Sequence, residues 1–424
     1  MTTNLAEVRL DHALSSRVRT LRIDLADIHW LRHGRRYGAV TPAVRDLSEL
    51  ALLVHEIDRR LPKRIVADRV RGVEVTVNLR EPHRWTPSVL EALGEVLYLQ
   101  GNAEWRFRIG QRDATGEILE AADPNPDPID KAPAMVALFS GGLDSTSGLA
   151  MLQGRADEVI ALSFYSSGNF RKQQQILAAL GFRRHAQVRG EFRTVGGRPR
   201  SGGAFNYRAF LFLALAAAEA ATAGVTDIYQ FENGPLALAI PPAPLFRITR
   251  HAHPTVQRRA ADLFSEVLGA PIRIHNPALG QTKRETVADL RQVLGAGFPE
   301  ILKLTETCWY LKAVGVVGGP SKSINQPCGS CIPCLVRRTA VGDDDPTDPR
   351  PLTSDPIHRV NVDAYLNFAE RLLDQSYGEE EFLRDAPWVT AQALRDGVSD
   401  LTLESALALY RRFAGELGDS FTRV

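Results

Sequence analysis

Six consecutive residues of this chain have the types and spacing needed to hold a phosphate chain. Ser140-Gly-Gly-Leu-Asp-Ser145 directly follows the apolar stretch 134–139, so a strand is expected to end in two glycines that open a helix. Glycine lets a backbone approach an anion closely, and free N–H groups at a helix N-terminus attract negative charge. We therefore predict an ATP site at Ser140, Gly141, Gly142, Leu143, Asp144, Ser145 and Thr146, in which Asp144 also holds Mg²⁺.

The spacing is not that of the Walker phosphate loop, which places a lysine directly after its second glycine. The alternative to a phosphate site is a tight turn that merely joins the strand to the helix. The apolar run, the paired glycines and the flanking hydroxyls together favour the phosphate site.

All four cysteines of the chain fall within one short region, at Cys308, Cys328, Cys331 and Cys334. Four thiolates can close a tetrahedral zinc site with no open position, which makes such a site structural rather than catalytic. An iron–sulfur cluster is the main alternative, because Cys-x-x-Cys spacing also serves those clusters. A redox pair fits less well, since no cysteine is left over. We predict a structural Zn²⁺ site.

Length, net charge and apolar runs limit the kinds of protein that this chain can be. A chain of 424 residues should form two or three domains, because single cores stop growing at about 250–300 residues. The net charge of +1 gives no overall attraction to nucleic acid or membranes, so neither is an expected partner. The N-terminus lacks a secretory signal and the apolar run 209–218 is too short to span a bilayer, so we expect a cytoplasmic protein.

Two linkers rich in proline and aspartate, 121–133 and 342–358, are expected to separate three regions. Residues 1–120 mix strand and helix patterns, which predicts an α/β accessory domain. Residues 134–341 alternate strand and helix, which is typical of a doubly wound parallel sheet. Residues 359–424 read as helical.

The expected elements follow from apolar periodicity. Strands are predicted at 18–25, 72–79, 104–109, 134–139, 159–164, 228–231 and 271–275. Helices are predicted at 47–61, 88–99, 145–152, 171–180, 208–223, 254–268 and 283–294.

The two motifs together resemble the 7-cyano-7-deazaguanine synthases, which are PP-loop ATP pyrophosphatases. The resemblance covers residues 134–341 and rests on SGGLDST after a strand, Thr307-Cys-Trp, and Cys328-Gly-Ser-Cys-Ile-Pro-Cys-Leu-Val-Arg337. It implies a PP-loop, adenine nucleotide alpha hydrolase-like fold, ATP, Mg²⁺, structural zinc, and 7-carboxy-7-deazaguanine as a carboxylate that is adenylated. In that family ammonia then gives an amide, which a second ATP dehydrates to the nitrile.

Two basic residues join Asp144 as predicted catalytic groups. Thr282-x-x-Glu285 is a capping box, so Lys283 could be an exposed residue of the first helical turn. The resemblance, through Lys283-Arg-Glu-Thr286, instead favours a lysine that neutralises charge on the leaving pyrophosphate. Arg208 begins an apolar helix, where the dipole disfavours a cation, so we expect a phosphate or a substrate carboxylate beside it. A solvated arginine is the alternative.

Substrate contacts are predicted at the ends of two strands. Glu232 and Asn233 follow a strand where open α/β sheets bind ligands, and Glu232 could accept hydrogen bonds from the guanidine-like edge of a deazaguanine. An ordinary Asn-Gly turn is the alternative. Phe164 ends another strand, where it could flank adenine or belong to the core.

A basic segment, 247–259, contains His251-Ala-His253. Two histidines at this spacing are a weak metal signal, and the neighbouring arginines indicate a loop that binds phosphate or an acidic partner. We therefore predict that Arg250 and His253 contact the substrate.

The chain departs from the family pattern in several places. The regions before 134 and after 341 are additional, and Phe164-Tyr-Ser-Ser-Gly-Asn169 lacks the family's Tyr-Gly-Gln. Phe231-Glu-Asn-Gly-Pro235 replaces an aspartate-containing loop. Such enlarged forms resemble the synthase-like proteins encoded in bacterial anti-phage gene clusters.

The predicted activity is ATP-dependent adenylation of a 7-deazaguanine carboxylate, followed by attack of an amine. The amine is either ammonia or part of a protein partner docked by residues 1–120. Two alternatives stay open, namely a PP-loop enzyme that thiolates tRNA and a nucleotide-binding subunit of a defence complex without turnover.

Overall fold

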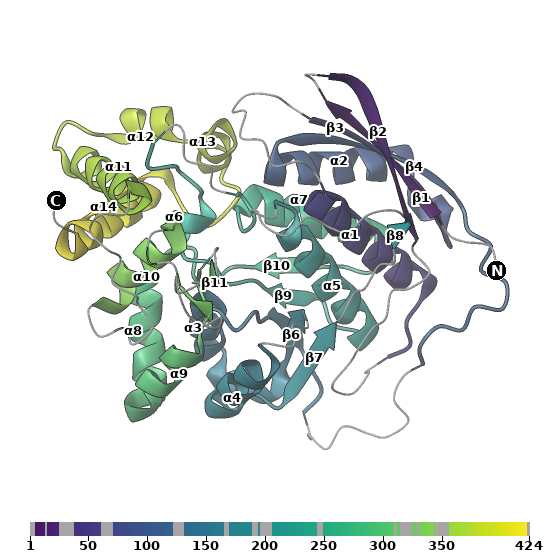
Figure 1. Ribbon diagram of the computed structural model, residues 1–424. Helices are drawn as coiled ribbons and strands as arrows, with labels where there is room; N and C mark the ends of the chain where they lie inside the picture. The colour runs from purple at the N-terminus through teal and green to yellow at the C-terminus, as the bar shows by residue number, and fades with distance from the viewer. Residues whose placement is uncertain are drawn as a thin grey trace, which may run out of the picture.

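A parallel sheet lies at the centre of the computed structural model, between a mixed N-terminal sheet and a group of C-terminal helices (Figure 1). The predicted α/β class with a doubly wound parallel sheet and a helical C-terminal region is confirmed. The structure describes residues 5–12, 15–24, 38–60, 71–121, 131–164, 169–188, 194–195, 206–243, 249–308, 312–313, 325–327, 329, 331–342, 345 and 356–421.

The central sheet has the strand order β10-β9-β5-β6-β7, with every neighbouring pair parallel. Its strands are β5 (Met135–Leu138), β6 (Val159–Phe164), β7 (Arg184–Val188), β9 (Asp227–Tyr229) and β10 (Arg273–His275). The chain leaves β5 toward β6 and β7 on one side, and later returns to form β9 and β10 on the other. The winding direction therefore reverses between β5 and β9, which is where such sheets bind ligands.

Helices cover both faces of this sheet because side chains alternate along β5. Val136 packs with α5 and α7, whereas Met135 and Ala137 pack with α3, α4 and α8. These helices are α3 (Leu143–Met151), α4 (Phe170–Leu180), α5 (Arg208–Ala223), α7 (Pro254–Leu268) and α8 (Lys283–Leu294), with the shorter α6 (Gly234–Ala237) and α9 (Phe298–Leu304). Short 3-10 turns lie at Gln153–Glu158 and Gly295–Gly297.

The N-terminal sheet has the order β4-β3-β1-β2-β8, and its last strand comes from far along the chain. The strands are β1 (Leu5–His12), β2 (Ser15–Asp24), β3 (Arg71–Leu79), β4 (Ala103–Gln111) and β8 (Thr194–Val195). Its helices are α1 (Pro42–Arg60) and α2 (Pro87–Gly101), with a 3-10 turn at Pro82–Arg84. A two-residue pairing also joins β11 (Lys312–Ala313) to β12 (Asn325–Gln326).

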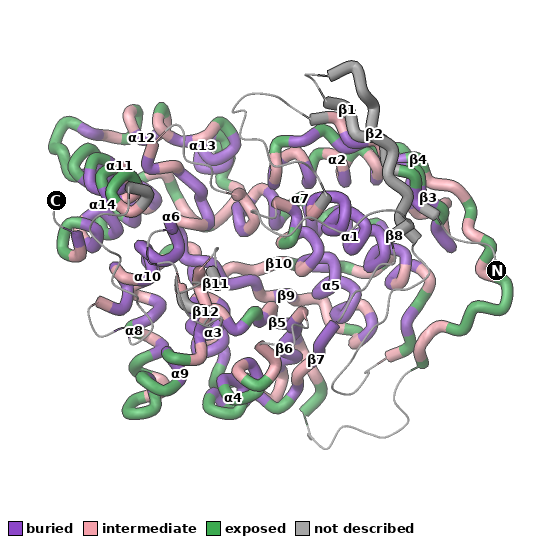
Figure 2. The backbone as a smooth tube through the Cα atoms, viewed as in Figure 1, coloured by how far each residue is buried: buried purple, intermediate pink, exposed green. Residues whose placement is uncertain are grey.

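One apolar core joins this N-terminal unit to the central sheet. The helix α1 packs on α5, and α2 packs on α7. Leu50 and Leu97 of the N-terminal helices belong to the same buried cluster as Phe210 and Phe264. Figure 2 shows the largely buried path of α1 and α5 and the exposed outer turns of α4 and α9. The core therefore continues across the predicted boundary at 121–133.

The C-terminal helices form a second buried cluster around α6. They are α10 (Ile332–Val341), α11 (Pro356–Leu373), α12 (Glu379–Asp385), α13 (Trp388–Arg395) and α14 (Leu403–Ser420). The buried Tyr410 of α14 donates its hydroxyl proton to Pro235 O at 2.8 Å and accepts from Ile240 N at 3.3 Å. The C-terminal region thereby holds the segment that follows β9. No helix in the described ranges is long and apolar enough to cross a bilayer.

Candidate active site at the carboxyl ends of the central strands

Residues 140–146 follow β5 and have the backbone shape that the two glycines predict. We call them the phosphate loop, after their predicted role. Gly141 has a φ of +80°, which side chains other than glycine rarely adopt, and Gly142 precedes α3 as its N-cap. The Ser140 hydroxyl accepts from Gly142 N at 3.1 Å and lies 3.1 Å from the Ser145 hydroxyl. Thr146 donates its hydroxyl to Gly142 O at 2.8 Å. These bonds brace the loop, while the first N–H groups of α3 have no partner within the helix.

Lys283 lies inside the protein and is paired with the phosphate loop. Its Nζ lies 2.6 Å from Asp144 Oδ2, and only 1% of its side chain is exposed. The capping box between Thr282 and Glu285 is also present. The cap therefore begins α8 at the position that sends Lys283 inward, and the alternative of an exposed first-turn lysine is wrong. A buried ammonium group needs such a partner, because desolvating an unpaired charge is costly.

Asn233 bridges two carboxylates at the point where the winding of the sheet reverses. Its Nδ2 donates to Asp144 Oδ1 at 3.1 Å and to Glu232 Oε1 at 2.9 Å. Its Oδ1 caps α6 by accepting from Leu236 N at 3.4 Å, which fixes the orientation of the amide. The residues predicted after β5 and after β9 are therefore brought together.

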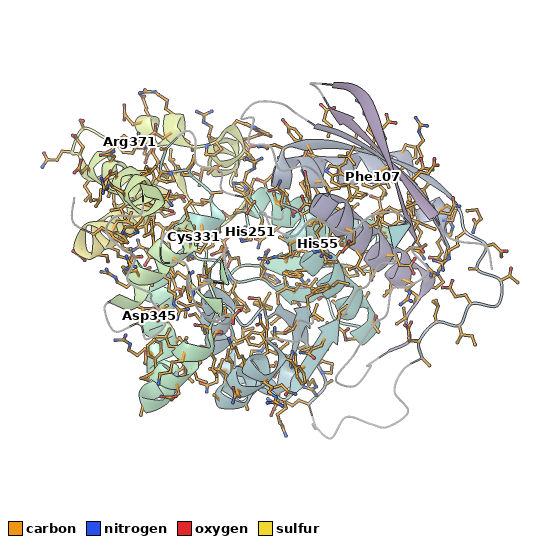
Figure 3. The ribbon with its side chains drawn as sticks, viewed as in Figure 1. His55, Phe107, His251, Cys331, Asp345 and Arg371 are labelled. Atoms are coloured by element: carbon orange, nitrogen blue, oxygen red, sulfur yellow. The ribbon has the colours of Figure 1, made fainter. Side chains whose placement is uncertain are left out.

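His251 completes this network, although the sequence had indicated it only as part of a basic loop. Its Nε2 lies 2.9 Å from Glu232 Oε2, and its Nδ1 lies 3.1 Å from Thr249 Oγ1 and 3.2 Å from Thr249 O. Gln230 donates to His251 O at 3.3 Å and holds the backbone in place. His251 lies near the middle of the molecule (Figure 3). Residues 232 and 251 both lie between β9 and α7, and no sequence motif links them.

Burial and charge shift the ionisation of this pair in a consistent way. Burial raises the pKa of Glu232, and the nearby charge of Asp144 raises it further. Burial alone would lower the pKa of His251, but the hydrogen bond and charge of Glu232 outweigh it and raise the pKa above its usual value. The charge of Arg208 opposes that rise, which places Arg208 within electrostatic reach of His251. Both oxygens of Glu232 already have a hydrogen-bond partner, His251 and Asn233, and its contact with the base of a deazaguanine stays a prediction.

Arg208 and Phe164 both lie near the ring of Phe212. The Arg208 guanidinium lies 5.8 Å from the centre of the Phe212 ring, and the Phe164 ring lies 5.9 Å from the same centre. Arg208 is exposed and Phe164 is half-buried. Contacts of these two residues with ATP stay predictions.

Two predicted substrate residues serve as structural contacts instead. His253 is fully buried, caps α7 by accepting from Thr255 N at 3.2 Å, and contacts Thr390 Oγ1 at 3.0 Å. Burial lowers its pKa to about 3, so the ring is neutral. Arg250 points to the end of α2, where its Nε donates to Leu99 O at 2.6 Å. Neither residue joins the network around Asp144, because both side chains tie other elements to this loop.

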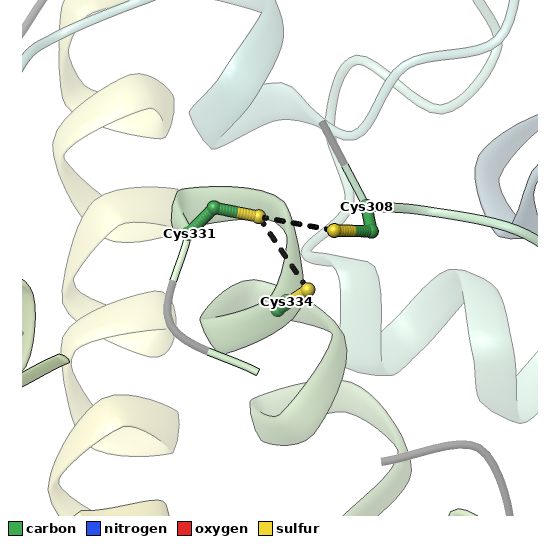
Figure 4. A group of neighbouring side chains, drawn as sticks. All are labelled: Cys308, Cys331 and Cys334. Atoms are coloured by element: carbon green, nitrogen blue, oxygen red, sulfur yellow. Dashed lines mark hydrogen bonds between the residues drawn. The ribbon is translucent and has the colours of Figure 1, made fainter. Parts of the chain in front are cut away.

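Three of the four predicted metal ligands converge (Figure 4). The sulfur of Cys331 lies 3.9 Å from that of Cys308 and 3.4 Å from that of Cys334, and all three lie within 4.8 Å of one another. Zinc–sulfur bonds of about 2.3 Å in a tetrahedron place sulfurs about 3.8 Å apart, so the group fits a zinc ion. Cys328 lies outside the described residues. Gly329 has a φ of +70°, which suits a tight turn there.

The cysteine region also touches the phosphate loop. Glu306 N donates to Gly141 O at 3.3 Å, and the Glu306 carboxylate pairs with Lys172 of α4. Arg337 of α10 donates to the hydroxyls of Thr305 at 2.8 Å and Thr307 at 3.1 Å. The segment 305–308 is thus held between the cysteine helix and the phosphate loop.

The chain is 30% identical over 241 residues to the 7-cyano-7-deazaguanine synthase of Anaeromyxobacter sp. (strain Fw109-5), a match that covers 50% of this chain and 94% of that synthase. The chain belongs to the 7-cyano-7-deazaguanine synthase family. A second 7-cyano-7-deazaguanine synthase, from Gloeobacter violaceus (strain ATCC 29082 / PCC 7421), is 29% identical over 228 residues, which cover 48% of this chain and 88% of that relative. No family model matches the chain.

Each match therefore leaves about half of this member of the 7-cyano-7-deazaguanine synthase family uncovered. The resemblance to the family is confirmed. The likeness to the enlarged anti-phage forms stays a prediction, because both relatives are named only as 7-cyano-7-deazaguanine synthases.

Proposed function

We propose that this protein uses ATP to adenylate the carboxylate of a 7-deazaguanine, such as 7-carboxy-7-deazaguanine, and passes the acyl group to an amine. The two relatives are named as synthases of 7-cyano-7-deazaguanine, and almost their whole length is matched. The observation that carries the proposal is the buried Lys283–Asp144 pair beside the glycine loop, because it sets a fixed cation where a phosphate chain would lie.

In the first half-reaction, a carboxylate oxygen of the substrate attacks the α-phosphorus of ATP. A new P–O bond forms, the bond to the β-phosphate oxygen breaks, and pyrophosphate leaves. The backbone N–H groups around Gly141 and Leu143 donate hydrogen bonds to phosphate oxygens. Lys283 neutralises the negative charge that builds on the leaving pyrophosphate. Such chemistry depends on positioning and charge neutralisation rather than on a side-chain nucleophile.

Asp144 keeps part of its carboxylate open, with 21% of the side chain exposed, so it can also bind Mg²⁺. The bound ion would add positive charge beside the phosphates. Arg208 is proposed to hold the substrate carboxylate or a phosphate, and Phe164 to flank the adenine. Phe164 is the last residue of β6, and Arg208, the first residue of α5, lies near the same Phe212 ring.

The cysteines are proposed to form a structural zinc site with Cys328 as its fourth ligand. Cys308, Cys331 and Cys334 share one cluster, which supports a structural role over sulfur transfer to tRNA. The zinc ion would hold segment 305–308 against the phosphate loop.

The amine acceptor is either ammonia or an amine of a protein partner. The N-terminal unit shares its core with the sheet, and Arg250, next to His251, reaches the end of α2. The additional residues therefore border the proposed site, and a partner bound there could present its amine to it.

The test is a product analysis. The protein is incubated with ATP, Mg²⁺, 7-carboxy-7-deazaguanine and ammonium, and products are identified by mass spectrometry. We expect AMP, together with the amide or nitrile, or a mass increase on a protein partner added to the reaction. Intact ATP and substrate, with zinc content and ATP binding confirmed in the same sample, would overturn the proposal.

A further inference from the structure

We infer that His251 accepts the proton from the amine that attacks the acyl-adenylate, and that Glu232 positions its imidazole for that step. The inference rests on the proposed function and assigns a residue to its second half-reaction. His251 would be the catalytic base, and Glu232, which acts through the ring, a positioning residue.

The first observation is that His251 is connected to the phosphate loop. One carboxylate oxygen of Glu232 lies 2.9 Å from His251 Nε2, and the other accepts from Asn233 Nδ2 at 2.9 Å. The same amide donates to Asp144 Oδ1 at 3.1 Å. The imidazole is therefore oriented by the same network that fixes the residue beside the phosphates.

The second observation is that the His251 side chain is partly exposed to solvent, whereas that of Glu232 is nearly buried. The side chain of His251 is 30% exposed, whereas that of Glu232 is only 11% exposed. A general base must come within hydrogen-bond reach of the proton that it removes. His253, two residues along the chain, is fully buried and cannot fulfil this role.

The third observation is that Thr249 offers partners for both protonation states of the ring. In the neutral ring, Nε2–H donates to Glu232 and Nδ1 accepts from the Thr249 hydroxyl at 3.1 Å. After protonation, Nδ1–H can donate to Thr249 O at 3.2 Å. The ring can therefore gain a proton at Nδ1 without turning.

The charges around His251 also favour its role as a base. Glu232 favours the protonated ring, Arg208 of α5 opposes it, and the net effect is a His251 pKa above its usual value. The charges of Asp144 and Lys283 act on Glu232, in opposite directions. Arg250, adjacent in the chain, directs its guanidinium to Leu99 O. A more basic imidazole has a greater driving force for accepting a proton.

Acyl transfer exchanges a C–O bond for a C–N bond. The nitrogen lone pair of the amine forms a C–N bond with the acyl carbon, and the C–O bond to AMP breaks with its electron pair on AMP. The proton released by nitrogen moves to His251 Nδ1. The products are the amide, AMP and an imidazolium ring, which then returns the proton from Nδ1 to water.

The test measures the two half-reactions separately in the full-length, zinc-loaded protein. For His251→Gln we expect acyl transfer to ammonia to fall about 100-fold or more relative to ATP–pyrophosphate exchange, as is typical for loss of a general base. The matched control is His83→Gln at an exposed position, which should leave both rates unchanged. Retained exchange also shows that the variant is folded.

The pH profile distinguishes a base from a structural residue. The transfer rate of the wild-type protein should rise with pH through one ionisation that His251→Gln removes. Glu232→Gln removes the charge that favours the protonated ring, so the rising limb should move to lower pH. Equal transfer rates for His251→Gln and wild type would overturn the inference. An absence of exchange in the wild-type protein would instead overturn the proposed function.

Discussion

The backbone N–H of Glu306 donates a hydrogen bond to the carbonyl of Gly141 at 3.3 Å. This bond joins the segment that ends at Cys308 to the glycine loop that follows β5. The two also fit closely, because a Cβ on Gly142 would lie only 3.0 Å from Glu306 O. The cysteine cluster and the phosphate loop are thus parts of one site, although 160 or more positions separate them in the numbering.

Removal of the metal should therefore weaken ATP binding. A chelator, or Cys334→Ser, should release segment 305–308 and raise the dissociation constant for ATP about tenfold, the equivalent of ~1.4 kcal/mol. Isothermal titration calorimetry measures the affinity, and elemental analysis measures the zinc content. An unchanged ATP affinity in folded, metal-free protein would show that the two motifs are independent.

Gly141→Ala should destabilise the phosphate loop. The φ of +80° would strain any residue with a Cβ, at a cost of about 1–2 kcal/mol in the free energy of unfolding. Urea denaturation measures that change. The control is Gly154→Ala, where a Cβ would meet nothing within 4 Å and φ is not positive. Equal effects of the two substitutions would contradict the conformational argument.

Lys283→Met should slow adenylation by about 100–1,000-fold, the usual loss when a preorganised charge-stabilising group is removed. Formation of AMP from ATP and the carboxylate substrate reports the rate. Lys303→Met on α9 is the matched control, because Lys303 is 48% exposed and pairs with Glu300 of its own helix. A variant at position 283 that keeps the wild-type rate would remove the lysine from the mechanism.

Tyr410→Phe should destabilise the protein by about 1–3 kcal/mol, because Pro235 O and Ile240 N would lose a buried partner. Thermal or urea unfolding measures the change. The same substitution at half-buried Tyr98 on α2 serves as the control and should change stability by less than about 0.5 kcal/mol. A similar small change at position 410 would mean that α14 does not support the segment after β9.

His253 should make stability depend on pH. Its pKa is about 3 in the folded protein, well below the usual value of about 6.5, so the unfolded chain binds more protons between these pH values. The free energy of unfolding is therefore unaffected by His253 protonation above pH ~6.5. Below that pH, His253 lowers it by about 1.4 kcal/mol for each pH unit, down to the folded-state pKa. His253→Gln should have a shallower slope of unfolding free energy against pH between pH ~6 and ~4. Parallel slopes would contradict a neutral, buried ring.

The sequence predicted those parts of the fold and site that depend on local pattern. The glycines before α3 and the capping box before Lys283 were predicted because each is encoded within a few residues. The grouping of Cys308, Cys331 and Cys334 was predicted because all the cysteines of the chain fall in one region. Residues 359–424 were predicted to be helical, and the buried Ala406, Tyr410 and Phe413 of α14 recur at helical spacing.

The remaining features depend on contacts between distant segments. The strand β7, which reads Arg184-His-Ala-Gln-Val188, is too short and polar for a clear pattern, and β8 pairs with the N-terminal sheet across the chain. His251 meets Glu232 only because the loop before α7 lies over the end of β9. Arg250 and His253 were predicted to contact the substrate but have structural roles instead. Their hydrogen-bond partners lie in α2 and α13, which the sequence does not place beside them.

The measurement that tests the central claim most directly is ATP–pyrophosphate exchange with 7-carboxy-7-deazaguanine in the zinc-loaded protein. We predict exchange that requires both Mg²⁺ and the carboxylate substrate, and that Lys283→Met lowers about 100–1,000-fold while Lys303→Met leaves it unchanged. Exchange that is absent in protein that binds ATP, or that proceeds equally without the carboxylate, would contradict adenylation of a deazaguanine at this loop.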